Sequence, residues 1–255
     1  MKRMFSQLSL ATFVVALAPF LAAQTTQDDL HAPDGNSYSR IVSIFIAPIA
    51  NAPFTADVST VWTRQTSDGA TVVVKNRRMV ARDAAGHVFE ERRRFVPGDS
   101  NSPSLLFQMD YIDPSRHTRT VCYPANKICD TYNFFAAPDT AVLPVGLLPD
   151  GKRYLSRENL GTDQIEGLTA VGTRETITTN PGDAGNDREV VSTKEFWYSP
   201  KLGINLVVKR FDPLQGTQVF TVSNIRLAAP DTRLFVIPAS YKVADQRTPD
   251  AAPAK

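Results

Sequence analysis

Residues 194–210, with the sequence KEFWYSPKLGINLVVKR, predict two β-strands joined by a tight turn. Successive side chains of a strand point to opposite faces of its sheet, so Phe196 and Tyr198 face one way and Trp197 faces the other. A sheet with one solvent-exposed face would not need aromatic side chains on both faces. The pattern therefore indicates that both faces of this strand are covered, either by a ligand on one side or by a plain hydrophobic core.

Strand signals of the same kind recur along the chain, whereas helix signals are scarce. Residues 56–62 alternate so that Val58, Thr60 and Trp62 share one face, and Asp68-Gly69 marks a hairpin turn. About ten strands joined by short turns must curl or close. The sequence thus predicts an all-β fold, with a few short helices possible, built as a single curled antiparallel sheet in the form of a half-barrel. The expected strands are 56–62, 71–82, 87–96, 104–113, a hairpin around 122–129, 154–162, 168–179, 189–199, 204–212 and 217–227.

Two segments are candidates for covering this curled sheet. Residues 134–152 are rich in Pro and Gly and form the longest irregular connection, either a covering loop or a short helical lid. Residues 41–53, which precede the first strand, are the other candidate. Either segment could lie over one side of the aromatic strand at 196–198.

Both ends of the chain differ in composition from the middle. A basic start, an apolar run and small residues near position 23 are the pattern of a secretory signal peptide over residues 1–23. Residues 24–37 form a polar arm and residues 244–255 a tail rich in Pro and Ala, so both are expected to be disordered. Residues 38–243 remain as a single β-rich domain. The expected location is outside the cytoplasm, in the periplasm or the medium.

The charge balance gives no reason to expect a nucleic-acid partner. Removal of residues 1–23 takes away Lys2 and Arg3 and no acidic residue, so that 26 basic side chains face 26 acidic ones. Nucleic-acid binding needs an excess of positive charge. A nucleic-acid partner is therefore not expected.

The chain has two cysteines, Cys122 and Cys129, in the sequence CYPANKIC. In an exported protein such a pair predicts a disulfide, here one that links the two strands of a hairpin. A redox pair and two metal-binding thiolates are the alternatives. Redox motifs usually have two residues between the cysteines, and a metal site would need further ligands, for which His117 is the nearby candidate.

The C-terminal third has a Trp-Tyr strand, a turn, a second strand, SNI at 223–225 and the pattern PDxxLFxIPxxY at 230–241. This order resembles the ending of periplasmic lipoprotein-carrier proteins of the LolA/LppX type. Residues 50–243 more closely resemble a group of uncharacterised exported proteins of acidobacteria, which share NAPFTA, ENLGTDQIEGLTAVGTRET and KEFWYSPKLGINLVVKR. The carrier resemblance implies a half-open barrel whose hollow takes acyl chains. It also implies that the partner is a lipid, a lipoprotein or an envelope protein, with peripheral membrane contact possible. The carriers fill that hollow with helices, and no strong amphipathic helix is evident here.

A ligand held in such a hollow would contact aromatic side chains on the concave face. Residues 104–113 alternate so that Phe107, Met109 and Tyr111 lie on one side. These three would share a wall with one side of the 196–198 strand. The candidate ligand-facing residues are Phe107, Met109, Tyr111, Phe196, Trp197 and Tyr198.

Basic residues gather on the predicted hairpin formed by residues 71–82 and 87–96. A band of this kind could bind phosphate or carboxylate groups, including those of anionic lipids. The alternative is a soluble outer face whose charges discourage pairing between sheet edges. The candidate anion-binding residues are Lys75, Arg77, Arg78, Arg92 and Arg94.

No motif in the sequence carries an enzymatic mechanism. Gly98-Asp99-Ser100 matches the start of a serine-esterase block, but those enzymes need a late histidine, and none follows His117. His31, His87 and His117 are isolated, so no metal ion or cofactor is expected.

The expected function is therefore that of an exported, non-catalytic envelope protein that binds an apolar or amphiphilic ligand or a protein partner. The alternatives are an envelope-stress sensor or regulatory module, and a hydrolase without a recognisable motif.

Overall fold

The computed structural model describes Ala32, residues 44–135 and residues 143–248. In these ranges the chain forms one large sheet and one short 3-10 helix, η2 (Thr232–Phe235). No helix there is long and apolar enough to cross a membrane. The strands are β1 (Phe54–Gln65), β2 (Thr71–Arg82), β3 (Val88–Arg93), β4 (Val96–Pro97), β5 (Leu106–Asp113), β6 (Thr118–Tyr123), β7 (Ile128–Asn133), β8 (Gly146–Leu147), β9 (Arg153–Ile165), β10 (Leu168–Thr179), β11 (Val190–Ser199), β12 (Ile204–Asp212), β13 (Gly216–Arg226) and β14 (Lys242–Asp245).

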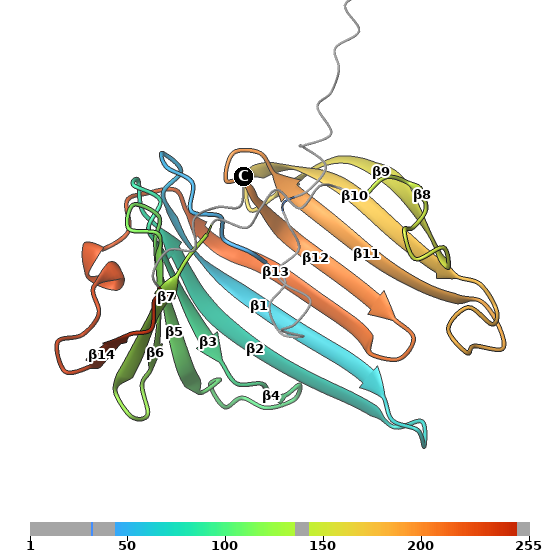
Figure 1. Ribbon diagram of the computed structural model, residues 1–255, viewed down its shortest axis with the longest axis horizontal. Coiled ribbons are helices and arrows are strands. Elements are labelled where there is room, and N and C mark those ends of the chain that lie inside the picture. Colours follow the sequence, from blue (N-terminus) through green and yellow to red (C-terminus); the bar gives the residue numbers. More distant parts are fainter. Residues whose placement is uncertain (1–31, 33–43, 136–142, 249–255) are drawn as a thin grey trace, which may run out of the picture.

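The sheet consists of two meanders joined by the ladder between β1 and β13, and a second long-range ladder adds β14 beside β7. Its strand order is β14-β7-β6-β5-β3-β2-β1-β13-β12-β11-β10-β9-β8, and β4 pairs with β2 beside this path. At the centre β1 pairs with β13, and at one edge β14 runs parallel to β7. Figure 1 shows the sheet curling, with β5, β6 and β7 turned steeply away from the direction of β9, β10 and β11. We call β5, β6 and β7 the β5–β7 wing.

Strand alternation gives the sheet two faces, which we call the core face and the outer face. The core face carries Val58 of β1, Val80 of β2 and Phe196 of β11, none of them more than 1% exposed. Ile44 and Ile46, which precede β1, pack against these side chains in one cluster. Removal of this apolar surface from water is the main stabilising contribution to the fold.

Arg82 shows that the core face is concave. Its side chain is fully buried and donates to the main-chain carbonyls of Ala47 (2.7 Å), Ala52 (2.9 Å) and Leu202 (2.7 Å). Leu202 lies in the turn between β11 and β12, whereas Arg82 ends β2. Between β2 and β12 lie β1 and β13, and neighbouring strands are about 4.8 Å apart. The contact therefore requires the sheet and its turn to curve toward the core face.

The predicted all-β class and the single curled antiparallel sheet are confirmed. The strands predicted over 71–82, 168–179 and 204–212 have the predicted bounds. Of the two candidate covers, the described part of 41–53 packs on the core face through Ile44 and Ile46.

The other predicted boundaries are placed as follows. Residues 1–23 and most of the 24–37 arm lie outside the described residues. Ala32 is described: it is buried, and its main-chain N–H and C=O both bind the Asn205 side chain, at 3.1 and 3.0 Å. In the 134–152 connection, residues 136–142 lie outside the described part, and Gly146–Leu147 forms the edge strand β8.

Candidate functional site

Cys122 and Cys129 form the predicted disulfide, which links facing residues of β6 and β7 with their Cα atoms 4.0 Å apart. Both side chains are fully buried on the outer face. Close approach of two Cα atoms on facing strands is typical of a non-hydrogen-bonded pair. The bridge therefore closes the hairpin at the rim of the sheet, where only the short strand β14 lies beyond.

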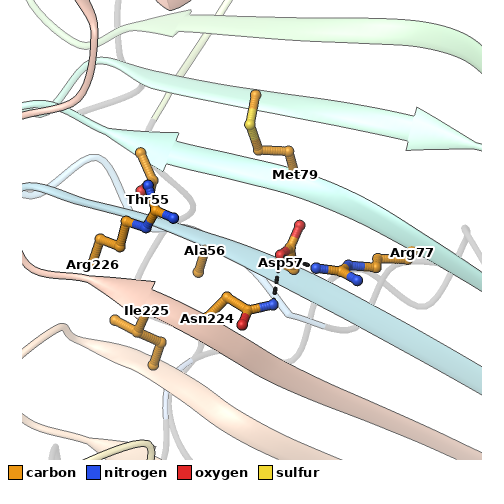
Figure 2. A pocket seen from close by; sticks show the side chains of 8 residues that line it. All are labelled: Thr55, Ala56, Asp57, Arg77, Met79, Asn224, Ile225 and Arg226. Atoms are coloured by element: carbon orange, nitrogen blue, oxygen red, sulfur yellow. Dashed lines mark hydrogen bonds and ion pairs between the residues drawn. The ribbon is translucent and has the colours of Figure 1, made fainter.

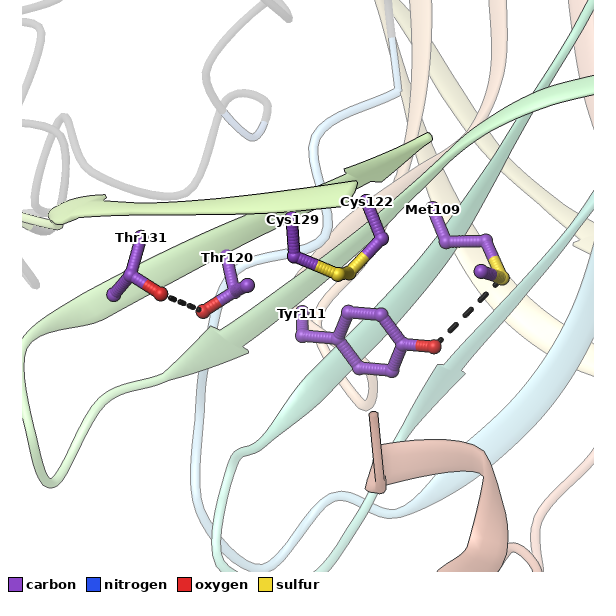
Figure 3. Close-up of a disulfide and its surroundings, with 6 residues drawn as sticks. All are labelled: Met109, Tyr111, Thr120, Cys122, Cys129 and Thr131. Atoms are coloured by element: carbon purple, nitrogen blue, oxygen red, sulfur yellow. Dashed lines mark hydrogen bonds between the residues drawn. A yellow bond between two sulfur atoms is a disulfide. The ribbon is translucent and has the colours of Figure 1, made fainter. Parts of the chain in front are cut away.

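Met109 and Tyr111, two of the predicted ligand-facing residues, lie beside this disulfide on the outer face of β5 (Figure 3). The Tyr111 hydroxyl is 3.7 Å from Met109 Sδ, and its ring centroid is 5.3 Å from that of Phe89. Burial, together with nearby Tyr241, raises the pKa of Tyr111 to about 12. The C-terminal segment thus approaches Met109 and Tyr111 from the outer side.

Phe107, nearer the start of β5, is the extra residue of a β-bulge opposite Arg92 and Arg93 of β3. It is half-buried, and the guanidinium of exposed Arg94 lies over its ring at 5.5 Å from the centroid. This cation–π contact brings together one predicted ligand-facing residue and one member of the predicted basic band.

The aromatic strand at 196–198 has a register shift between Trp197 and Tyr198 in its pairing with β12. Phe196 lies in the core, and Trp197 lies on the outer face, packed against Gly172, where an added Cβ would meet the indole ring. The Trp197 Nε1–H donates to Glu195 Oε1 at 2.9 Å. Tyr198 is half-buried opposite Asn205. The register thus places Trp197 on the side of Met109 and Tyr111, although the indole also packs against the core cluster that contains Phe196.

The predicted basic band is divided between the two faces. Lys75 and Arg77 lie on the outer face, where Arg77 pairs with Asp57, whereas Arg78 and Arg92 lie on the core face. Neighbours in sequence point to opposite sides of a strand, so Arg77 and Arg78 cannot belong to one surface.

On the core face, five charged side chains from β2, β3, β5 and β6 form what we call the arginine network. Arg78 Nη1 lies 2.8 Å from Glu90 Oε2, and Arg92 Nη2 lies 3.5 Å from the same oxygen. Arg92 Nε donates to Asp110 Oδ2 at 3.0 Å, and Arg119 Nη2 reaches that oxygen at 3.2 Å. The network therefore joins four strands through two shared carboxylate oxygens.

Most of the arginine network is removed from solvent. The side chains of Arg78, Glu90 and Asp110 are 5%, 4% and 2% exposed, Arg92 is 15% exposed, and Arg119 is 41% exposed. Burial lowers the pKa of Arg78 despite the neighbouring Glu90. Burial also acts to lower the pKa of Arg92, but Glu90 and Asp110 outweigh it and raise that pKa. Both arginines stay protonated at neutral pH.

Partly exposed apolar side chains continue the core face beyond the network. Tyr132 of β7 faces Arg119 of β6 and is 42% exposed, and the facing pair Tyr123 and Ile128 is 37% and 39% exposed. The arginine network together with Tyr123, Ile128 and Tyr132 is the candidate functional site, which we call the wing site. Sequence reasoning did not single out Arg119, although Arg119, Val121 and Tyr123 alternate in TRTVCY and so share one face.

A shallow depression of about 530 Å³ on the outer face is the second candidate (Figure 2). A β-bulge in β13 at Asn224 and Ile225 lies opposite Ala56 and aims the Asn224 side chain at Asp57. Burial opposes ionisation of Asp57, but Arg77 and Asn224 hold its pKa below the ordinary value. Because the Asp57 carboxylate is already held by these two side chains, the depression offers a ligand little that is unpaired.

The residues weighed for enzymatic chemistry are apart from one another. Ser100 Oγ accepts a hydrogen bond from the Ser102 N–H at 3.1 Å. His87 Nδ1 lies 2.7 Å from Asp83 Oδ2, and His87 Nε2 lies 3.6 Å from Asp113 Oδ1, so both nitrogens face carboxylates. In the described residues, no group of three His, Cys, Asp or Glu side chains is placed to hold a metal ion.

Solved structures similar to this chain include the MucA/MucB complex of Pseudomonas aeruginosa, with 13% identity, a TM-score of 0.35 and coverage of 74% of this chain and 58% of the matched one. A LolA superfamily protein from Nitrosomonas europaea has 12% identity and a TM-score of 0.28, with 74% and 91% covered. Lipoprotein LppX from Mycobacterium tuberculosis has 12% identity and a TM-score of 0.25, with 69% and 88% covered.

This chain spans about three fifths of the chains matched in the MucA/MucB complex and in a MucB structure, 58% and 62%. No protein-family model and no curated protein matches it. The predicted resemblance to LolA/LppX-type proteins is confirmed among solved structures, at low identity. The resemblance to exported acidobacterial proteins stays a prediction.

Proposed function

We propose that this is an exported, non-catalytic envelope protein that binds an amphiphilic ligand, such as a lipid or a lipoprotein acyl chain, at the wing site. The observation that carries the proposal is the half-exposed group Tyr123, Ile128 and Tyr132 on the concave core face. Elsewhere on that face, large apolar side chains such as Phe196 and Phe220 are about 1% exposed. An apolar surface left open beside a packed core favours a ligand with an apolar chain.

Export is supported by two independent features. The signal-peptide pattern of residues 1–23 would direct the chain out of the cytoplasm. The Cys122–Cys129 disulfide suits an oxidising compartment, because cytoplasmic thiols are kept reduced. The periplasm, the cell surface and the medium all meet that condition.

Thermal unfolding with an uncharged amphiphile tests the proposal. Dodecyl maltoside, kept below its micellar concentration, should raise the Tm, because a ligand at a hundredfold excess over its Kd stabilises the folded state by about 2.7 kcal/mol. Tyr132→Ser should weaken this binding about tenfold. Tyr154→Ser, at a 53% exposed tyrosine of β9 near the other edge of the sheet, is the matched control and should bind normally. An unchanged Tm, or equal binding by both variants, would overturn the proposal.

A protein partner is the second candidate, as expected of an envelope sensor. Strand β9 runs from Arg153 to Ile165. Along its edge away from β10, it pairs with β8 only at Tyr154 and Leu155. Within the described residues the rest of that edge has no strand partner, and an exposed edge can accept an added strand. Slowed hydrogen exchange over residues 156–165 in envelope extract, without a lipid mass on the protein, would favour this candidate.

A hydrolase is the third possibility, and Ser100 is its candidate nucleophile. Its hydroxyl accepts from the Ser102 main chain, and no histidine of the described residues is hydrogen-bonded to it. A generic ester panel should therefore show no significant turnover. Robust activity that disappears in Ser100→Ala would replace the non-catalytic proposal.

A further inference from the structure

We propose that the arginine network is an anion site: Arg92 and Arg119 bind the phosphate or carboxylate group of the ligand. This inference deepens the proposed function, because it adds a charged head group to an apolar chain held by Tyr132 and its neighbours. It rests on the charge balance, the Asp110 oxygen that two arginines share and one unpaired buried nitrogen.

The charge balance of the network is positive. Three guanidinium groups, those of Arg78, Arg92 and Arg119, face two carboxylates, those of Glu90 and Asp110. Four of these five side chains are 85% or more buried. An uncompensated charge in such surroundings is unfavourable, because burial removes its hydration. An added anion would remove the imbalance.

Three of the four carboxylate oxygens already have a donor. Asp110 accepts from Arg92 and Arg119 through Oδ2, and from Gln108 Nε2 through Oδ1 at 2.9 Å. Glu90 Oε2 accepts from Arg78 and has Arg92 at a longer distance. The fourth oxygen, Glu90 Oε1, accepts from none of the three guanidinium groups in the described residues.

Arg92 Nη1 is the donor left over. It is buried and has no hydrogen-bond partner within the described part of the chain. Buried polar atoms are normally paired, so an orphaned guanidinium nitrogen calls for a missing partner. Asn76 Oδ1, a buried acceptor on β2, is also unpaired there, and the Asn76 amide donates to the carbonyl of Arg93, so this oxygen competes with an anion for Arg92 Nη1.

Arg119 gives the site its exposed side. It uses one nitrogen on Asp110, and its side chain remains 41% exposed. Because Arg92 and Arg119 both contact the single atom Asp110 Oδ2, their guanidinium groups lie close enough for one phosphate or carboxylate to bridge them.

Two other buried arginines, Arg82 and Arg157, have their donors engaged by the protein. Arg82 uses its donors on three main-chain carbonyls, and Arg157 pairs with Glu175 at 2.6 Å. On the outer face, Arg77 pairs with Asp57. Tyr132 faces Arg119 across the β6–β7 ladder, so an apolar chain on Tyr132 would leave its head group at the network.

Calorimetric titration of three probes tests the inference: dodecyl phosphate, dodecyl maltoside and inorganic phosphate. Wild type should bind dodecyl phosphate about tenfold more tightly than dodecyl maltoside, as expected for charge-assisted hydrogen bonds. Arg119→Gln should bind dodecyl phosphate about tenfold more weakly than wild type does, and its affinity for dodecyl maltoside should be unchanged. Arg116→Gln, at an 80% exposed arginine in the same β5–β6 hairpin, is the matched control. Arg119 is the preferred site because, unlike Arg92, its partial exposure lets the variant fold.

The outcomes separate the inference from the proposed function. If Arg119→Gln and Arg116→Gln bind dodecyl phosphate equally, the anion site is overturned, while Tyr132-dependent binding of dodecyl maltoside would still support the function. If inorganic phosphate alone binds and Arg119→Gln abolishes it, the anion site stands with a free anion as its ligand, and the amphiphile proposal fails. If no probe binds, both are overturned.

Discussion

The Arg82 guanidinium donates to the main-chain carbonyl of Leu202 at 2.7 Å, although the two residues are 120 positions apart in the chain. Arg82 has no carboxylate partner among the described residues and is held instead by three carbonyl oxygens. Burial lowers its pKa to about 10, so it stays protonated at neutral pH. Arg82 thus fastens β2, the segment before β1 and the β11–β12 turn at one point.

Replacement of Arg82 by Met should destabilise the protein by about 3–5 kcal/mol, because it leaves three buried carbonyls without donors. Urea unfolding measures the change. Arg64→Met, at an exposed arginine of β1, is the control and should stay within about 0.5 kcal/mol of wild type. Similar losses in both variants would contradict the role given to Arg82.

Glu195 should contribute to acid unfolding. Burial opposes its ionisation, but Lys209, Trp197 and Arg174 lower its pKa from 4.5 to about 2. A carboxyl whose pKa is lower in the folded state stabilises above its unfolded pKa, and this contribution is lost as the pH falls from about 4.5 to about 2.

Glu195→Gln should therefore lose less stability than wild type between pH 7 and pH 3. Urea unfolding at the two pH values, followed by tryptophan fluorescence, provides the measurement, because Trp197 contacts Glu195. Glu158→Gln, at a 60% exposed carboxylate that pairs with the same Arg174, should keep the wild-type pH dependence. An unchanged pH dependence in Glu195→Gln would refute the assignment.

The disulfide should stabilise the hairpin from which the wing site projects. Closing a loop between residues seven positions apart contributes about 2.5 kcal/mol in the chain-entropy model. The double variant Cys122→Ser/Cys129→Ser should lose this amount in urea unfolding, and reduced wild type should match it. Intact mass should show no free thiol before reduction. Two alkylatable thiols in the untreated protein would disprove the bridge.

Gly216 should be intolerant of any side chain. Its φ is +81°, and an added Cβ would collide with the main-chain carbonyl oxygen of Thr63 at the end of β1. Gly216→Ala should cost about 1–2 kcal/mol for the left-handed backbone and about 1–3 kcal/mol more for the collision. Gly69→Ala shares the positive φ of +85° but has open space around it, so it should show the backbone cost alone. If Gly216→Ala and Gly69→Ala lower the free energy of unfolding equally, in thermal or urea unfolding, the collision is excluded.

Much of the fold was predictable because it rests on local patterns. Alternation placed Val58 and Thr60 on one face of β1 and separated Phe196 from Trp197, and the short spacing of Cys122 and Cys129 indicated their bridge. These features depend on neighbours in sequence. Turn residues likewise defined the ends of β10 and β12.

The site was harder to predict, because it depends on which distant segment covers each face. Met109 and Tyr111 look like a ligand wall in sequence, but the C-terminal segment approaches them: Tyr241 is near Tyr111, and Phe235 lies 6.4 Å from His87 between ring centroids. The arginine network draws on four strands, and its ion pairs follow from registers that no local pattern specifies.

The ladder between β1 and β13 has a consequence for the order of assembly after export. Hairpins on either side close short loops, but Val58 meets Val222 only after a loop of about 160 residues has closed. The two halves of the sheet should therefore form first and join late, leaving the apolar edges of β1 and β13 exposed meanwhile. Refolding yield should fall as protein concentration rises, and pulsed hydrogen exchange should protect β10 and β12 before β1. If β1, β10 and β12 become protected from hydrogen exchange at the same time, the ladder between β1 and β13 does not form last.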